Sequence, residues 1–328
     1  MMNYIGIDVS KAKIDVLWLK DTDQLKIKAK ALSNNLAGFK QLVVWLDKNL
    51  AVSPSNIRIV LEATGVYHEA LAYFLHDHGY IVSVINPAYI RKFADGLGTQ
   101  HKTDKTDSFI LARYGFLVQP PVWQPEPKPV RQLKALIARV DALKADLQRE
   151  ENRLEKADAT DTPDNVVASI HDMIHSLNVA IAKLTQDIDD HVDGHPDLKN
   201  DQNLLESIPG VGKKVALSML ALIHSRSFEN ADQLTAFVGL IPKHRESGVF
   251  RGRTTLSKNG NRRIRALLYF PAVVATKYND HIKAQYHRLL KAGKTKMQAI
   301  GAAMRKLVQL CFGVLKNKRP YDAQYQAA

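Results

Sequence analysis

Residues 4–11 restrict the possible folds of this chain most, because they place one carboxylate inside an apolar strand. Asp8 lies between Ile7 and Val9, and a second apolar run, residues 14–19, follows a short polar turn. This pattern predicts a β-hairpin that presents Asp8 from a buried strand. An ionised carboxylate buried without a partner is strongly unfavourable, so we expect Asp8 to be neutralised by a bound cation, by an Arg or Lys, or by taking up a proton.

Three further acids could share that cation. Glu62 ends the apolar run that starts at residue 57, while Asp104 and Asp107 open a helix that we expect to continue past residue 112. Acids three residues apart lie on one helix face, with Cβ atoms about 5–6 Å apart. Oxygen ligands from two strand ends and one helix suit Mg²⁺ or Mn²⁺, as in sites that hold two ions. Alternatively, Asp104 and Asp107 only complement a helix dipole.

The rest of residues 1–117 alternates between strand-like and helix-like segments. A third strand is expected near residues 25–32, then an amphipathic helix capped by Asn34 or Asn35. After Glu62 we expect a helix over residues 67–78, a strand over 80–85 and further helix. The order predicts a mixed sheet with helices on its faces, an α/β domain followed by mostly α-helical structure.

Prolines and helical spacing divide the middle of the chain. Residues 118–130 are rich in proline and should form an extended linker. Apolar residues then recur every three or four positions over residues 131–195, interrupted by a polar loop. This spacing predicts an antiparallel coiled-coil hairpin, which could also recruit a second copy of the chain.

Positive charge is concentrated in residues 196–328. The chain has a net charge of +13, and residues 201–328 hold 22 Lys and Arg against 7 Asp and Glu. Such an excess predicts salt-sensitive contact with a polyanion, usually nucleic acid. The turn Pro209-Gly210-Val211-Gly212, followed by a helix from Lys213, is typical of a helix-hairpin-helix module that holds a DNA phosphate. A plain interhelical turn is the alternative.

A polar loop near residue 247 is a candidate catalytic element. Ser247 precedes Gly248, and arginines there could stabilise the charge that develops when a hydroxyl attacks a phosphate. An ordinary Ser-Gly turn is the alternative. The expected DNA-binding residues are Lys213, Lys214, Arg245, Arg251, Arg253, Lys258, Arg262, Arg263 and Arg265.

Several classes of protein are not supported by the composition. No run of 18 apolar residues occurs and no signal sequence opens the chain, so we expect a cytoplasmic, nucleoid-associated protein. Cys311 is the one cysteine, which excludes an internal disulfide. The 12 histidines show no metal-binding spacing, so structural zinc is not expected.

With these motifs assembled, the chain resembles the DEDD transposases of bacterial insertion sequences, the family that includes the Piv and MooV DNA invertases. The matching segments occur in the family's order. They are Tyr-Ile-Gly-Ile-Asp-Val-Ser-Lys (4–11), Leu-Glu-Ala-Thr-Gly-Val-Tyr (61–67), Lys-Thr-Asp-Lys-Thr-Asp (102–107), Ile-Pro-Gly-Val-Gly (208–212), Val-Gly-Leu-Ile-Pro (238–242) and Ser-Lys-Asn-Gly-Asn-Arg-Arg-Ile-Arg (257–265).

The resemblance implies a RuvC-like, ribonuclease-H-type domain whose metal-binding acids are Asp8, Glu62, Asp104 and Asp107. It also implies a C-terminal transposase domain with Ser247 as nucleophile, although the family's usual Ser-Ser-Gly-Gly is replaced here by Glu246-Ser247-Gly248-Val249. The resemblance further implies guidance by an RNA that the element encodes and assembly as dimers and tetramers.

The leading hypothesis is a Mg²⁺-dependent DNA transposase that forms a phosphoserine intermediate on double-stranded DNA. A structure-selective endonuclease, or junction resolvase, would need only the four acids and water. A sugar kinase or actin-like ATPase would need a second glycine-rich phosphate loop, for which no segment is suited. A DNA-binding protein without catalysis would show no cleavage that depends on divalent ions.

Overall fold

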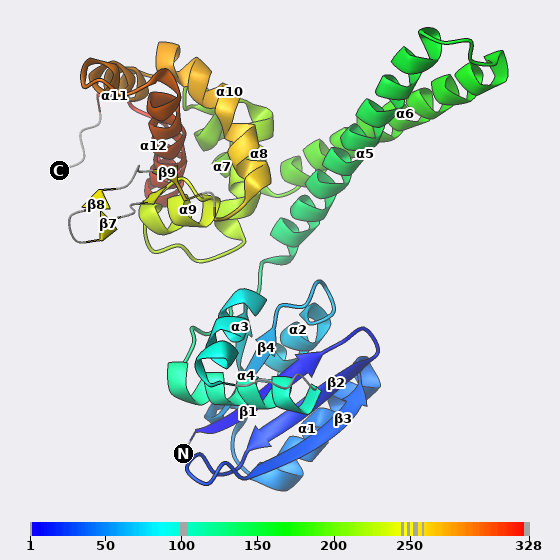
Figure 1. Cartoon of the computed structure of the whole chain (residues 1–328), viewed down its shortest axis with the longest axis vertical. Helices are drawn as coiled ribbons and strands as arrows, with labels where there is room; N and C mark the ends of the chain where they lie inside the picture. The colour runs from blue at the N-terminus through cyan, green and yellow to red at the C-terminus, as the bar shows by residue number, and fades with distance from the viewer. Residues whose placement is uncertain are drawn as a thin grey trace. The chain divides into compact units, whose positions relative to one another are not determined.

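The computed structural model describes residues 2–98, 104–243, 246–247, 250–251, 255–257 and 259–324. For residues 104–105, 246–247 and 250–251 it describes the backbone only. The chain divides into two compact units, Met1–Pro125 and Glu126–Ala328 (Figure 1). Within the described part of the chain, no helix is both long and apolar enough to cross a lipid bilayer.

The first unit is built on a mixed sheet, which confirms the predicted α/β arrangement. Its described strands are β1 (Asn3–Val9), β2 (Lys13–Leu19), β3 (Ile27–Ser33), β4 (Ile57–Glu62) and β5 (Ile81–Ile85). They lie in the order β3-β2-β1-β4-β5, and the first four strands of this order are labelled in Figure 1. β1, β2 and β3 pair antiparallel, whereas β4 and β5 run parallel to β1. This order fits the ribonuclease-H-type fold that the resemblance implied.

Helices cover both faces of this sheet. They are α1 (Leu36–Leu50), α2 (Glu69–Asp77), α3 (Pro87–Gly96) and α4 (Asp104–Val118), with a short 3₁₀ turn, Pro54–Asn56, before β4. Ile5 and Ile7 share one apolar cluster with α1 and α2 residues such as Leu42 and Leu71. On the opposite face Leu17 packs with Ala112 of α4. Asn35 begins α1, as predicted, because its side chain accepts a hydrogen bond from the Gly38 N–H.

The proline-rich segment packs against the sheet of the first unit. The Trp123 N–H donates to the Val82 carbonyl of β5 at 2.7 Å, and its ring makes an edge contact with Tyr73. The Pro120 carbonyl accepts hydrogen bonds from Arg58 and Ser83. Residues 120–123 are therefore held at the edge of the sheet beside β5.

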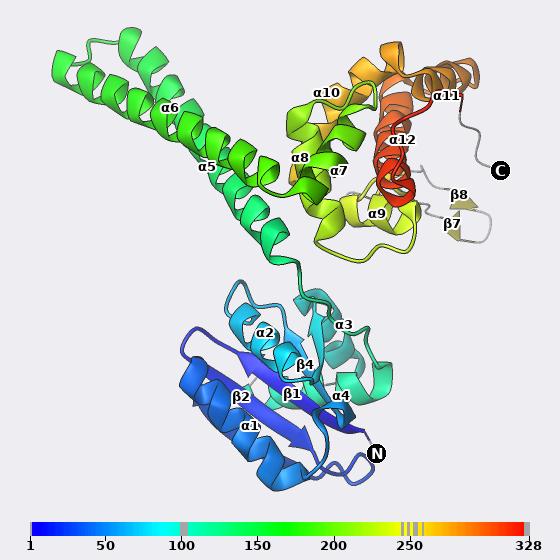
Figure 2. The ribbon, with the colours of Figure 1, turned by 180° about the vertical axis from the view of Figure 1, so that it is seen from behind.

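The second unit begins with two long antiparallel helices, α5 (Lys128–Asp158) and α6 (Asp164–Asp193). α5 starts within the range expected for the linker, because Pro129 occupies the first turn, where its missing N–H costs no hydrogen bond. Leu133 and Val140 of α5 and Ile188 of α6 are buried in the main apolar cluster of this unit. Figure 2 shows the two helices side by side.

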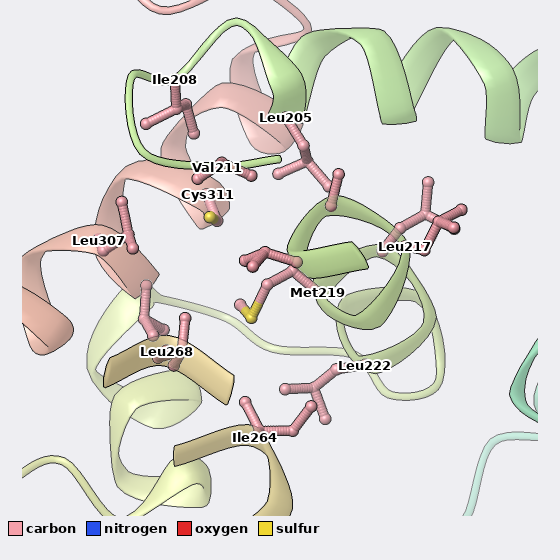
Figure 3. Close-up of a cluster of buried hydrophobic side chains, with 14 of the residues drawn as sticks. Leu205, Ile208, Val211, Leu217, Met219, Leu222, Ile264, Leu268, Leu307 and Cys311 are labelled. Atoms are coloured by element: carbon pink, nitrogen blue, oxygen red, sulfur yellow. The ribbon is translucent and has the colours of Figure 1, made fainter. Parts of the chain in front are cut away.

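The remainder of the second unit is a helical body. Its described elements are α7 (Pro196–Glu206), α8 (Lys213–His224), α9 (Ala231–Val238), α10 (Arg262–Tyr278), α11 (Asp280–Lys291), α12 (Lys296–Asn317) and the short strands β6 (Pro242–Lys243), β7 (Glu246–Ser247), β8 (Phe250–Arg251) and β9 (Thr255–Leu256). Its core includes Met219 of α8, Leu268 of α10 and Leu307 of α12 (Figure 3). Cys311 is also buried there, and burial raises the pKa of its thiol to about 12.

A buried carboxylate joins three helices of this body. Asp201 of α7 is 1 % exposed and lies 2.5 Å from Lys318 Nζ, just after α12, and 2.7 Å from His224 Nε2 at the end of α8. Two partners compensate the loss of hydration of this carboxylate. The contacts therefore hold the ends of α8 and α12 on α7.

Candidate active site at the ends of β1 and β4

Two of the predicted acids occupy equivalent positions on neighbouring parallel strands. Ile7 of β1 pairs with Leu61 of β4, and the next residues are Asp8 and Glu62. Parallel strands end at the same edge of a sheet, and side chains in register lie on the same face. Asp8 and Glu62 are therefore neighbours at the carboxyl edge of the sheet, and both are partly buried.

The face that carries these acids is the face covered by α4. Gly6 and Val60 are also in register and, two residues before Asp8 and Glu62, lie on the same face. A Cβ on Gly115 of α4 would lie 2.8 Å from Val60 Cγ2. The acids of the two strands thus lie toward the helix that begins with Asp104.

Gly6 lets α4 approach β1 more closely than any side chain would allow. A Cβ at this position would lie 2.0 Å from the Ser108 carbonyl oxygen and 2.5 Å from the Ala112 nitrogen. Both are backbone atoms of the helix, so rotation of a side chain could not relieve the clash. Glycine is therefore required at Gly6 by packing.

Ser108 fixes the first turns of α4 to the hairpin at Asp8. Its side chain is buried, with 1 % of the residue exposed. Its hydroxyl donates to the Asp15 carbonyl at 2.7 Å and accepts the Asp8 N–H at 3.4 Å. Because Asp107 precedes Ser108 and Asp104 lies one turn earlier, this contact holds the first turns of the helix beside β1.

The structure places the backbones of all four predicted acids, but only three of the side chains. Those of Asp8, Glu62 and Asp107 are described, each engaged in a polar or electrostatic interaction, whereas that of Asp104 lies outside the described residues. Among the described side chains, no group of three carboxylate, imidazole or thiol groups is gathered closely enough to hold a metal ion. The donor chemistry, all carboxylate oxygen, nevertheless fits Mg²⁺ or Mn²⁺.

A fifth carboxylate, which the sequence analysis missed, lies beside Asp8. Asp15 of β2 is the direct cross-strand partner of Asp8, so both side chains lie on the face covered by α4. Lys13 Nζ lies 3.0 Å from Asp15 Oδ2, and Asp15 and Ser108 line a cavity of about 220 Å³. The hairpin register would have revealed the pair, because a turn between Ser10 and Lys13 places residue 15 opposite residue 8.

The structure describes Ser247 through its backbone. Glu246–Ser247 pairs antiparallel with Phe250–Arg251, and Ser247 is opposite Phe250. Arg245, Arg253 and Lys258 lie outside the described residues, and of Arg251 only the backbone is described. These residues belong to the second unit, whereas the acids belong to the first.

The segment after this loop is anchored to the end of α9. Gly260 has a φ of +142°, and a Cβ there would lie 2.2 Å from the Phe237 carbonyl oxygen. The Ser257 N–H donates to the Ile241 carbonyl at 2.9 Å. Gly260 is therefore restricted to glycine both by its backbone conformation and by the close approach.

The predicted DNA-binding residues that the structure describes differ in their surroundings. Lys213 Nζ lies 2.7 Å from Asp189, Arg263 pairs with Asp141, and Arg265 Nη1 donates to the Val238 carbonyl at 2.9 Å. Lys214 and Arg262 are exposed. Three of these cations thus already have partners within the protein.

The glycine-rich turn before α8 combines a glycine of positive φ with a helix start that has no side-chain cap. Gly210 has a φ of +100°, and its missing side chain lets the turn approach Pro271 and Ala275 of α10. Gly212 begins α8 without a side-chain cap. The first N–H groups of a helix lack intrahelical partners and bind anions readily.

Comparison with known proteins links these features to transposases. A family model described as "Transposase" matches residues 5–157, and one described as "Transposase IS116/IS110/IS902 family" matches residues 202–287. The pilin gene-inverting protein of Moraxella bovis is 32% identical over 326 residues, covering 97% of each chain. That of Moraxella lacunata matches equally well. An uncharacterised 43.6 kDa protein of insertion element IS110 from Streptomyces coelicolor is 25% identical over 169 residues, covering 51% of this chain and 41% of its own.

Proposed function

The chain belongs to the IS116/IS110/IS902 family of transposases, and from this premise we propose that it cuts and rejoins double-stranded DNA through a metal-dependent acidic site and a serine nucleophile. The observation that carries the proposal is the juxtaposition of Asp8 and Glu62 at one edge of the sheet, with α4 fastened beside them by Ser108.

The acidic centre would consist of Asp8, Glu62, Asp104 and Asp107. These carboxylates would hold Mg²⁺ or Mn²⁺, which when bound polarises the scissile phosphate and stabilises negative charge on its oxygens. Ser108 and Gly6 contribute by position, because they set the distance between α4 and β1. Lys13 neutralises Asp15 at 3.0 Å, which limits repulsion at the centre.

Ser247 would act as the nucleophile. Its hydroxyl oxygen forms a bond to the phosphorus and loses its proton, while the bond between the phosphorus and the 3′ oxygen breaks and that oxygen takes up a proton. The product is a phosphoserine ester to one DNA end and a free 3′ hydroxyl on the other. Rejoining reverses these changes with the 3′ hydroxyl of a different end. Arg245, Arg251 and Arg253 would neutralise the transferred phosphate.

Binding of DNA would involve the turn over residues 207–212 and the uncapped start of α8, acting as a helix-hairpin-helix module. The exposed Lys214 and Arg262, with Lys213, Lys258, Arg263 and Arg265, would supply phosphate contacts. The α5 and α6 pair, acting as a coiled coil, would join copies of the chain into dimers and tetramers. An RNA encoded by the element would select the target.

A second candidate is an endonuclease in which water attacks the phosphate. It is favoured by one observation, that the predicted acids belong to a single compact unit which does not contain Ser247. Such an enzyme would leave hydrolysed ends without a protein adduct.

Covalent trapping separates the two candidates. The protein is incubated with Mg²⁺, a plasmid carrying its gene with both flanking regions, and RNA transcribed from them. We expect a protein–DNA adduct that is lost in Ser247→Ala and in Asp8→Asn, and kept in the matched control Ser257→Ala. An adduct in Ser247→Ala would exclude this nucleophile, and cleavage without any adduct would favour the endonuclease.

A further inference from the structure

Helix α10 presents a row of exposed apolar side chains, which we call the α10 stripe. It consists of Phe270, Val274 and Tyr278, which follow one another at intervals of four residues and therefore lie on one face of the helix. Phe270 is 74% exposed, Val274 45% and Tyr278 71%. The helix is labelled in Figure 1.

The stripe is distinct from the face that folds the unit. Ile264, Leu268, Ala272 and Ala275 of the same helix are buried in the core. Phe270 also makes an edge contact with Tyr269, whose hydroxyl lies 3.8 Å from the sulfur of Met297 at the start of α12. Met297 is itself 61% exposed. Large apolar side chains grouped in this way mark an interaction surface.

The charge around the α10 stripe identifies the kind of partner. α10 contains four basic residues and no acidic residue. Arg262 and Lys277 are exposed at its two ends, and Lys294 and Lys296 are exposed beside Met297. Aromatic faces between cations suit single-stranded nucleic acid, whose bases stack while its phosphates are neutralised. A second copy of the same surface would instead oppose cation to cation.

The stripe also borders the turn to which we assign duplex DNA. Gly210 packs against Pro271 and Ala275, which directly follow Phe270 and Val274 in the helix. At 1.5 Å per residue, the two aromatic side chains are separated by about 12 Å along the axis, the length of a few extended nucleotides. Cleaved DNA held at the turn would therefore have a stacking surface beside it.

We propose that the α10 stripe binds a segment of single-stranded DNA, with bases stacked on Phe270 and Tyr278 and phosphates held by Arg262 and Lys277. This inference rests on the proposed function, because single-stranded DNA is exposed when strands are cut and exchanged. It adds to that function a surface for the unpaired strand, separate from the site of cleavage.

The test measures binding of a fluorescent oligothymidylate of about 12 nucleotides by anisotropy, without divalent ions. Phe270→Ala and Tyr278→Ala should each weaken binding about tenfold, and the double variant more, with duplex binding much less affected. Tyr89→Ala, which removes an exposed tyrosine of the first unit, is the matched control and should bind normally. In Phe270→Trp, affinity should be retained and the new indole fluorescence quenched by the oligonucleotide.

Three results would overturn the inference alone. The first is unchanged oligothymidylate affinity in the double variant with duplex binding intact, which would leave the proposed function standing. The second is a stripe-dependent affinity for oligouridylate but not for oligothymidylate, which would make the partner RNA. The third is that the double variant sediments as a smaller assembly than the wild type while its affinity for DNA is unchanged, which would make the partner a second copy of the chain. Failure to bind either form of DNA would instead refute the proposed function together with the inference.

Discussion

Gly6→Ala should damage both the stability of the first unit and the geometry of the proposed acidic centre. The added Cβ would lie 2.0 Å from the Ser108 carbonyl oxygen, 2.5 Å from the Ala112 nitrogen and 2.9 Å from Leu111 Cβ. To reach even 3.0 Å from that oxygen, α4 would have to move by about 1 Å. Overpacking of this kind lowers the free energy of unfolding by about 1–3 kcal/mol. Because the clash here is with rigid backbone, we expect a loss of about 3 kcal/mol for Gly6→Ala.

The same movement should reduce activity more than stability alone explains. A shift of about 1 Å would weaken the hydrogen bond between Ser108 and the Asp15 carbonyl, now 2.7 Å long. The acids at the start of α4 would move relative to Asp8, and misplacement by about 1 Å can cost about 100-fold in rate. Cleavage should therefore fall by about that factor even at a temperature at which the variant remains folded.

The assay for stability uses a natural reporter. All three tryptophans of the chain, Trp18, Trp45 and Trp123, belong to the first unit. Tryptophan fluorescence, excited selectively during urea unfolding, therefore reports that unit alone. Gly96→Ala is the matched control, because nothing lies within 4 Å of its added Cβ, and it should be neutral or slightly stabilising. A Gly6→Ala variant as stable and active as the wild type would refute the close approach of α4 to β1.

Three other perturbations test separate parts of the molecule. Ser108→Ala should cost about 1–2 kcal/mol in urea unfolding and raise the Mg²⁺ concentration needed for cleavage, whereas an unchanged metal requirement would make Ser108 purely structural. Asp201→Ala removes the charged hydrogen bonds to Lys318 and His224 and should destabilise the second unit by about 1–3 kcal/mol by circular dichroism, unlike the exposed Asp197→Ala. Cys311 should resist alkylation at pH 8 until urea unfolds the protein, because burial raises its thiol pKa to about 12.

Local patterns were sufficient to predict the sheet of the first unit. Alternating apolar residues gave β1, β2, β4 and β5 closely, because each strand is bounded by turn residues and has a buried face. The expected strand over residues 25–32 begins later, at Ile27, since Leu25 adopts a left-handed turn with φ of 54°. The expected helix from residue 67 begins at Glu69, because residues 65–68 form turns first.

Contacts between distant segments could not be predicted in this way. Periodicity identifies α4 as a helix, but it does not show that the Ser108 hydroxyl would reach the hairpin between Asp8 and Asp15, about a hundred residues away. Composition marked the proline-rich segment as extended, yet the hydrogen bond from Trp123 to Val82 depends on which edge of the sheet is open. Both hydrogen bonds depend on how helices and strands pack against one another, whereas sequence patterns predict each helix or strand separately.

The residues Asp8 and Asp15 form a directly opposed pair of carboxylates in the antiparallel pairing of β1 and β2. Like charges at directly opposed positions of an antiparallel pair destabilise a sheet, and a neutral pair would avoid that cost. Lys13 lies 3.0 Å from Asp15 and offsets part of the repulsion. Asp8 in turn has Glu62 beside it on the parallel strand, so three carboxylates share this face of the sheet. In the proposed function a cation would be held among these carboxylates, whose oxygens are the donors that a metal-dependent centre for phosphoryl transfer requires.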